Sequence, residues 1–158
     1  MRYKTVSLIV IFLLYSSLLF ARTEVYFSPS KRTQDAIIEY IEKANESLDI
    51  AIYSITSKPI AEAIQRARQR GIKVRILVDR IQATSQASLW HWLGAKIDQR
   101  SGLMHNKFII RDNKDVSTGS LNFTNNAIYR NRENLVILYD KNVAKKFEIE
   151  FEKLWKDN

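Results

Sequence analysis

The residues best suited to chemistry lie between His105 and Asn122. His105 and Lys107 are separated by a single residue, and so are Ser120 and Asn122. Because a β-strand places alternate side chains on one face, a strand beginning at His105 would put His105 and Lys107 side by side. An imidazole can attack phosphorus, while an ammonium group and neutral donors can hold phosphoryl oxygens. These residue types and spacings therefore suit cleavage of a phosphodiester.

Two short strands are predicted to position these side chains. In a strand that begins at His105, Phe108 and Ile110 fall on the opposite face, toward a core. Residues 111–115 are typical of a turn, and residues 116–119 are predicted to return as a second strand that delivers the two downstream polar residues. We therefore expect a β-hairpin with one chemical face and one core face.

Strand and helix patterns alternate along the rest of the chain, which favours an α/β fold. Strands are predicted at residues 25–27, 47–53, 73–78 and 133–139, and helices after the N-cap residues Thr33, Ser57 and Asp140. A short helix is predicted at residues 85–93. The last helix places Val143, Phe147, Phe151 and Leu154 on one face. We expect a mixed β-sheet flanked by helices on both faces, forming a single domain over residues 22–158.

The complete spacing is His-x-Lys, four residues, Asp, six residues and Gly-Ser-x-Asn, and the sequence from His105 to Asn122 matches it without a departure. This motif resembles that of the phospholipase D superfamily. Six specified positions within eighteen residues are a specific match, whereas His-x-Lys alone would not be. The chain is more similar to small secreted bacterial endonucleases of that superfamily, which carry the motif once and have a downstream glutamate, matched here by Glu133. The similarity extends more weakly over residues 24–155.

The resemblance implies a role for each motif residue. In the family the histidine becomes a covalent phosphohistidine, so His105 is the expected nucleophile. Lys107, Asn122 and Ser120 are expected to hold phosphate oxygens, although Ser120 could equally serve the turn after Gly119, which we consider structural. One chain supplies one suitable histidine, whereas the reaction also needs an acid for the departing oxygen. A homodimer with a shared site is therefore expected, as in the family, where one histidine attacks and its symmetry mate protonates the leaving group.

Neighbouring charged residues have competing interpretations. Glu133 matches the family's orienting glutamate and could accept a hydrogen bond from His105, but it could equally pair with Arg130 or Arg132. The two arginines are candidates for sequence-independent contacts with flanking phosphates of a nucleic acid. Asp112 shares the parity of the core-facing strand residues, so a turn or a buried ion pair suits it better than proton transfer.

Other basic and aromatic residues favour structural interpretations. The basic residues within 66–75 are typical of a solvated helix end. Trp90 and Trp92, in the predicted short helix, could stack on unpaired bases, but core packing is the favoured interpretation.

Composition limits the partners. The 158-residue chain has a formal net charge of +8, and its first 21 residues hold two bases and no acid, which leaves +6 on the remainder. Such a surplus favours polyanions such as nucleic acid or anionic lipid. Cysteine is absent, and two histidines are few for a metal site built by protein side chains alone. We expect no metal and no cofactor.

Residues 1–21 have the pattern of a secretory signal peptide. Arg2 and Lys4 precede an uncharged apolar run, and Ala21 is small. The run is shorter than the roughly 20 residues of a spanning helix, which favours cleavage near Ala21. Leu19 is not the small residue expected three positions before that cut, so an uncleaved membrane anchor is the alternative. We expect an exported protein, periplasmic or secreted.

The function predicted from these patterns is a metal-independent phosphodiesterase, specifically a sequence-nonspecific endonuclease acting on DNA or RNA. Two alternatives remain open. A phospholipase D acting on lipids would use the same chemistry in a different groove, and a nucleic-acid-binding or uptake module would keep the motif without turnover.

Overall fold

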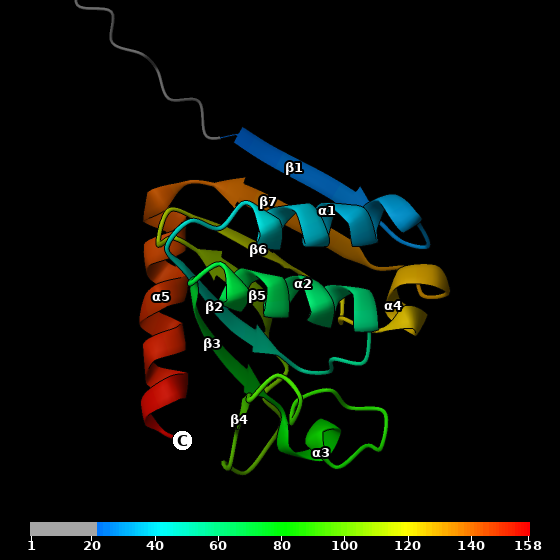
Figure 1. The fold of residues 1–158 in the computed structure, drawn as a ribbon, viewed down its shortest axis with the longest axis vertical. Helices are drawn as coiled ribbons and strands as arrows, with labels where there is room; N and C mark the ends of the chain where they lie inside the picture. Colours follow the sequence, from blue (N-terminus) through cyan, green and yellow to red (C-terminus); the bar gives the residue numbers. More distant parts are fainter. Residues whose placement is uncertain (1–21) are drawn as a thin grey trace, which may run out of the picture.

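The computed structural model describes residues 22–158, and the predicted signal peptide lies outside the described residues. Seven strands form one sheet in the order β1-β7-β6-β5-β2-β3-β4 (Figure 1). The elements are β1 (Arg22–Phe27), α1 (Lys31–Glu42), β2 (Ser47–Ile52), α2 (Lys58–Gln69), β3 (Lys73–Val78), α3 (Arg80–Ala83), β4 (Lys96–Ile97), β5 (Lys107–Arg111), β6 (Asp115–Gly119), α4 (Asn125–Tyr129), β7 (Asn134–Tyr139) and α5 (Lys141–Lys156).

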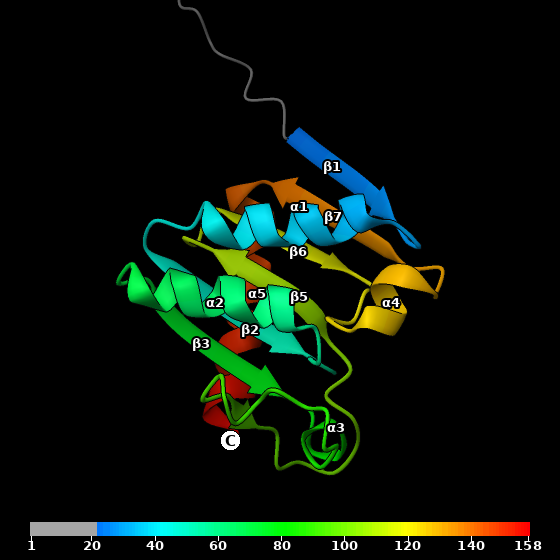
Figure 2. The same ribbon diagram turned by 45° about the vertical axis from the view of Figure 1, so that its right-hand side comes forward.

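The sheet is mixed, as predicted. β2, β3 and β4 are parallel, whereas the β1–β7, β7–β6, β6–β5 and β5–β2 pairs are antiparallel. Helices α1 and α2 lie across one face, and α5 covers part of the other (Figures 1 and 2). Two apolar cores result, one on each face of the sheet. The predicted α/β domain with helices on both faces is confirmed.

Helix α1 starts earlier than predicted. Its N-cap is Ser30, whose side chain accepts from the backbone N–H of Arg32. Thr33, the predicted cap, is buried in the first turn and donates to the carbonyl of Phe27 at 2.8 Å. Both residue types suit a cap, but the Thr33 hydroxyl is engaged with the Phe27 carbonyl at the end of β1.

Helix α2 follows the prediction more closely. Ser57 occupies the N-cap position without a capping side-chain hydrogen bond, and Pro59 lies in the first turn, where its missing N–H costs nothing. Gly71, just beyond the helix, has φ +85°, a conformation that favours glycine. The helix buries Ile60 and Ile64 against the sheet.

Helix α5 forms the second core, as its apolar spacing predicted. Asp140 caps it by accepting from the backbone N–H groups of Asn142 and Val143. Phe147 and Phe151 pack edge-on against Phe108 of β5, with ring centroids 5.1 and 6.3 Å apart. Helix α5 therefore packs on β5, the hairpin strand that follows His105, and supports the motif from that face of the sheet. No helix within residues 22–158 is long and apolar enough to cross a bilayer.

The predicted short helix at residues 85–93 is wrong. The chain instead forms α3 and then a series of turns. Asp79 caps α3 directly after β3, so the helix begins and ends before residue 85. Trp90 packs on the core and donates its ring N–H to the carbonyl of Ala83, which confirms its expected core role, whereas Trp92 is 48% exposed.

Candidate active site

The predicted hairpin brings His105 and Lys107 together. β5 begins at Lys107 rather than at His105, which lies in the preceding loop. The Lys107 ammonium nitrogen is nevertheless 3.2 Å from Nδ1 and 3.4 Å from Nε2 of His105, and it donates to the His105 carbonyl at 2.8 Å. The imidazole is exposed while the lysine is buried. An imidazole thus faces solvent with a buried ammonium group beside it.

The surroundings of Lys107 change its pKa. Desolvation lowers the pKa of Lys107 below its ordinary value, and the nearby Glu133 carboxylate raises it in partial opposition. A poorly hydrated ammonium attracts an anion more strongly than a fully hydrated one. Lys107 therefore suits the binding of a phosphoryl oxygen next to the imidazole.

Ser120 and Glu133 form a second polar group at the end of β6. The Ser120 hydroxyl donates to Glu133 Oε2 at 2.6 Å and accepts from the backbone N–H of Asn134 at 3.1 Å, while Asn131 donates to Glu133 Oε1 at 3.1 Å. No hydrogen bond joins Glu133 to His105 within the described chain, so the orienting role of this carboxylate stays a prediction. Here Glu133 is held by Ser120 and Asn131.

Gly119 is required by the close approach of two strands. Its φ of +150° is strained for any other residue, and an added Cβ would overlap the Asn134 carbonyl oxygen and lie 2.8 Å from Asn134 Oδ1. This supports a structural role for Gly119, and the close approach sets Ser120 against Glu133.

Asn122 contributes an acceptor without a partner. Its Oδ1 atom is buried and accepts no hydrogen bond from residues 22–158. The segment is anchored next door, where the Phe123 N–H donates to the Ser54 carbonyl at 3.1 Å. Buried polar atoms are rarely left unpaired, so Oδ1 would accept from a donor on a bound group, whereas a phosphoryl oxygen would be held by the amide Nδ2 of the same side chain.

Asp112 holds the hairpin turn against the start of β2, in agreement with its predicted structural role. Its carboxylate accepts from the backbone N–H groups of Asn45, Glu46 and Ser47 at 2.7 to 3.2 Å. Burial raises the pKa of Asp112, but these three N–H donors outweigh it and hold the pKa below its ordinary value.

We predict that Asp112→Asn lowers the free energy of unfolding by about 2 kcal/mol at neutral pH, because it removes a charged acceptor from three donors. Since the pKa is depressed in the folded state, this contribution is complete above the unfolded-state pKa of about 3.9 and is lost as the pH falls through the folded-state pKa. Urea unfolding at pH 7 and pH 3 should show the mutant deficit shrinking in acid. Asp35→Asn, which alters an exposed pair with Lys31, should change little; a pH-independent deficit for Asp112→Asn would contradict the account.

Two residues that position the site were not predicted. Asp79 is buried, caps α3, and accepts from the backbone N–H of Met104, the residue before His105, at 2.9 Å. The ring of Tyr53 lies 4.5 Å from the ring of His105, centroid to centroid. Each residue directly follows a buried parallel strand, a position where functional side chains often gather, and this was the signal available in the sequence.

The arginines near Glu133 do not pair with it. Arg130 and Arg132 are exposed, and neither forms an ion pair in the part of the chain that the structure describes. The basic residues between 66 and 75 mostly serve the fold: Arg66 pairs with Glu42, and Arg75 pairs with Asp49 and Glu152.

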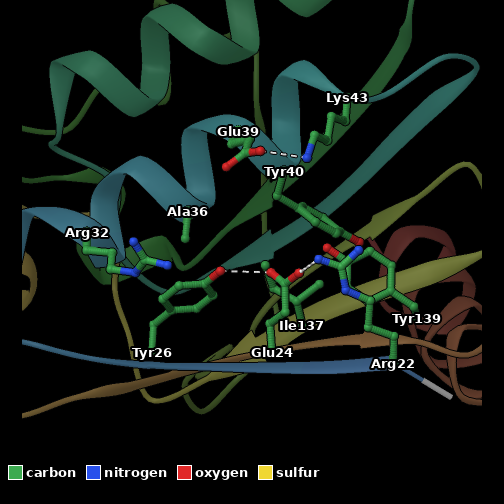
Figure 3. Close-up of a pocket in the computed structure, with 10 residues that line it drawn as sticks. All are labelled: Arg22, Glu24, Tyr26, Arg32, Ala36, Glu39, Tyr40, Lys43, Ile137 and Tyr139. Atoms are coloured by element: carbon green, nitrogen blue, oxygen red, sulfur yellow. Dashed lines mark hydrogen bonds and ion pairs between the residues drawn. The ribbon is translucent and has the colours of Figure 1, made fainter. Parts of the chain in front are cut away.

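A hollow of about 360 Å³ between α1 and the β1–β7 edge lies apart from the motif residues (Figure 3). Its charges are largely satisfied internally, because Glu24 accepts from Arg22 and Tyr26, and Lys43 pairs with Glu39. Residues 22–158 also hold no group of three or more His, Cys, Asp or Glu side chains arranged to bind a metal ion.

Comparisons with known proteins agree with the motif. Residues 37–155 match the family described as cardiolipin synthase, PLD-like domain. The chain is 37% identical over 137 residues to phospholipase D of Rickettsia felis, covering 84% of this chain and 68% of that protein. It is 35% identical over 133 residues to mitochondrial cardiolipin hydrolase of Mus musculus, covering 81% and 60%. The chain thus spans about two thirds of the length of these relatives.

Solved structures extend the comparison to the fold. Nuc from Salmonella typhimurium, a phospholipase D family member, superposes with a TM-score of 0.82 at 30% identity, covering 87% of this chain and 95% of that one. NucT from Helicobacter pylori superposes with a TM-score of 0.78 at 28% identity, covering 87% and 97%. The resemblance predicted from the motif is confirmed: the chain belongs to the phospholipase D superfamily and carries the phosphodiesterase domain of that superfamily.

Proposed function

We propose that this protein cleaves nucleic acid as a sequence-nonspecific endonuclease, without a metal ion, through a phosphohistidine at His105. The observation that carries the proposal is the contact between the exposed imidazole of His105 and the buried ammonium of Lys107. The basic surplus of the chain and the exposed Arg130 and Arg132 favour a polyanionic substrate with a continuous phosphate backbone.

The reaction has two steps on one phosphorus atom. A ring nitrogen of His105 attacks phosphorus, a P–N bond forms, and the P–O bond to the departing alcohol breaks. Lys107 and Asn122 hold the phosphoryl oxygens as charge builds on them. Water then attacks the phosphohistidine, which releases the phosphate monoester and frees the imidazole. Each step needs a proton donor or acceptor opposite His105.

A homodimer supplies that second group in the proposal. The chain has two histidines, and the other one, His91, lies in the turns after α3 against Trp90. His105 of the partner subunit would protonate the departing oxygen and later activate water. The exposed apolar side chains of β1, Val25 and Phe27, are 51% and 68% exposed and would offer a surface for this contact. Ser28, next to Phe27, is hydrogen-bonded to Glu133, so this surface adjoins the site.

Mixing subunits tests the shared site. When wild-type and His105→Ala subunits exchange at equal input, a shared site leaves activity only in the roughly one quarter of dimers that are wholly wild type. Independent sites would leave about half, falling linearly with the wild-type fraction. His91→Ala subunits, mixed in the same way, should leave the activity unchanged.

The substrate class is tested with purified protein on single-stranded DNA, duplex DNA, RNA and phosphatidyl lipid vesicles, each with and without excess EDTA. We expect cleavage of nucleic acid that survives EDTA, because Lys107 and Asn122 do the work of a metal ion. Loss of activity on chelation, restored by magnesium, would refute the metal-independent mechanism. Binding of nucleic acid without any cleavage would identify a non-catalytic module instead.

A lipid substrate is the second candidate, and the names of the relatives favour it. Two of them are called phospholipase D and mitochondrial cardiolipin hydrolase. The His105 chemistry would be the same, and anionic lipid also suits a basic protein. Cleavage of phosphatidyl lipid with intact DNA and RNA in the same panel would replace the endonuclease proposal with this one.

A further inference from the structure

Tyr53 covers one side of the nucleophile. Its ring lies 4.5 Å from the His105 ring at an interplanar angle of 57°, and the Lys107 ammonium lies 5.2 Å from the centre of the same Tyr53 ring. The Tyr53 ring, the His105 imidazole and the Lys107 ammonium therefore each contact the other two. An aromatic ring attracts both partners, through tilted ring packing and through a cation–π contact.

The tyrosine is itself held by two hydrogen bonds. Its backbone N–H donates to the carbonyl of Asn106, the residue between His105 and Lys107, at 3.0 Å. Its hydroxyl accepts from Gln82 of α3 at 3.0 Å. Asp79 caps that helix and also accepts from the Met104 N–H. The same carboxylate therefore fixes both the loop before His105 and the helix that carries Gln82. The ring of Tyr53 is thus a fixed surface.

The imidazole needs such a surface. His105 lies outside regular structure, and within residues 22–158 its ring donates no hydrogen bond to a carboxylate or a backbone carbonyl. The nearly equal distances from Lys107 to Nδ1 and Nε2 do not select one ring orientation. Packing against Tyr53 restricts the rotation of the imidazole, which an in-line attack on phosphorus requires.

We propose that Tyr53 is a positioning residue that holds the imidazole of His105 in its attacking orientation through ring packing, with its hydroxyl serving only to anchor the ring to α3. This inference rests on the proposed phosphodiesterase function. The aromatic ring of Tyr53, and not its hydroxyl, then positions the imidazole.

Two variants separate the ring from the hydroxyl. Tyr53→Phe keeps the ring and should retain kcat within about threefold, whereas Tyr53→Leu removes the ring and should lower kcat about 100-fold with KM changed less than about threefold. Hydrolysis of bis(4-nitrophenyl) phosphate, a small phosphodiester that needs no binding groove, provides the assay. Equal losses in Tyr53→Phe and Tyr53→Leu, or a Tyr53→Leu rate near wild type, would overturn the proposal.

Proton NMR of the histidine rings provides a readout that does not depend on turnover. The chain has two histidines, so His105→Ala assigns both sets of ring signals and His91 serves as an internal reference. Wild-type protein and Tyr53→Phe should show cross-relaxation between the residue-53 ring and His105, together with a ring-current shift. Tyr53→Leu should lose the shift at His105 and leave His91 in place.

The two readouts distinguish the possible failures. Absence of the ring contact in wild-type protein overturns the positioning role even if Tyr53→Leu cannot be folded. A ring contact in a protein that hydrolyses no phosphodiester would mean that the proposed function itself has failed.

Discussion

Replacing His105 with alanine is expected to lower phosphodiester cleavage by at least about 10⁴-fold while the protein stays folded. The change removes the nucleophile, and in a symmetric dimer it also removes the proton donor, so no part of the covalent route survives. The imidazole is exposed and bears no fold-supporting contact beyond Tyr53 and Lys107, which is why the melting temperature should change little. Cleavage rates and thermal unfolding of the purified variant provide the measurement.

His91→Ala is the matched control, since it deletes the other histidine of the chain from the turns after α3. Its activity should equal that of wild type. Binding of substrate to His105→Ala should also persist, because the basic surface is untouched. A His105→Ala variant that cleaves at a rate close to wild type would show that the motif is structural in this protein.

Lys107→Ala is expected to lower kcat by about 10² to 10³-fold, the loss seen when one donor to a developing oxyanion is removed. In the described chain the Lys107 ammonium lies against both ring nitrogens of His105, and alanine leaves that position without a cation. Lys114→Ala, in the turn of the same hairpin, removes an exposed lysine paired with Glu46 and should have little effect. A comparable loss in both variants would point to a general charge effect.

The pH dependence of the wild-type rate follows from the same lysine. Burial lowers the pKa of Lys107, so the ammonium is lost at a lower pH than an exposed lysine would require. We expect kcat to decrease as the pH rises, with the decrease centred at a pH below the ordinary lysine pKa of about 10.4.

Local patterns predicted the parts of the site that depend on neighbours in the sequence. Strand alternation placed Phe108 and Ile110 in the core on the α5 side, and the parity of Asp112 correctly set it apart from His105. These predictions succeeded because a hairpin of a few residues is governed by its own alternation and turn. The expected chemical face of β5 is only partly polar, because Ile109, on the same face as Lys107, is buried in the larger core. The motif supplied the remaining positions at fixed spacing.

Contacts between distant segments escaped prediction for a physical reason. Tyr53 and Asp79 reach the motif only because β2 and β3 end beside the start of β5, and this adjacency is a property of the sheet order. The helix at residues 85–93 was predicted from local composition, but Trp90 instead packs onto the core from a turn. Tertiary packing outweighed local propensity there.

Trapping the covalent intermediate decides whether the reaction passes through His105. Wild-type protein mixed with a phosphodiester substrate and quenched within the first turnovers, at high pH where phosphohistidine persists, is digested and analysed by mass spectrometry. We predict a phosphoryl adduct on the peptide that contains His105, absent from Lys107→Ala at the same time point and never found on the His91 peptide. Substrate turnover with no adduct at any quench time, or an adduct on another residue, would contradict a phosphohistidine at His105.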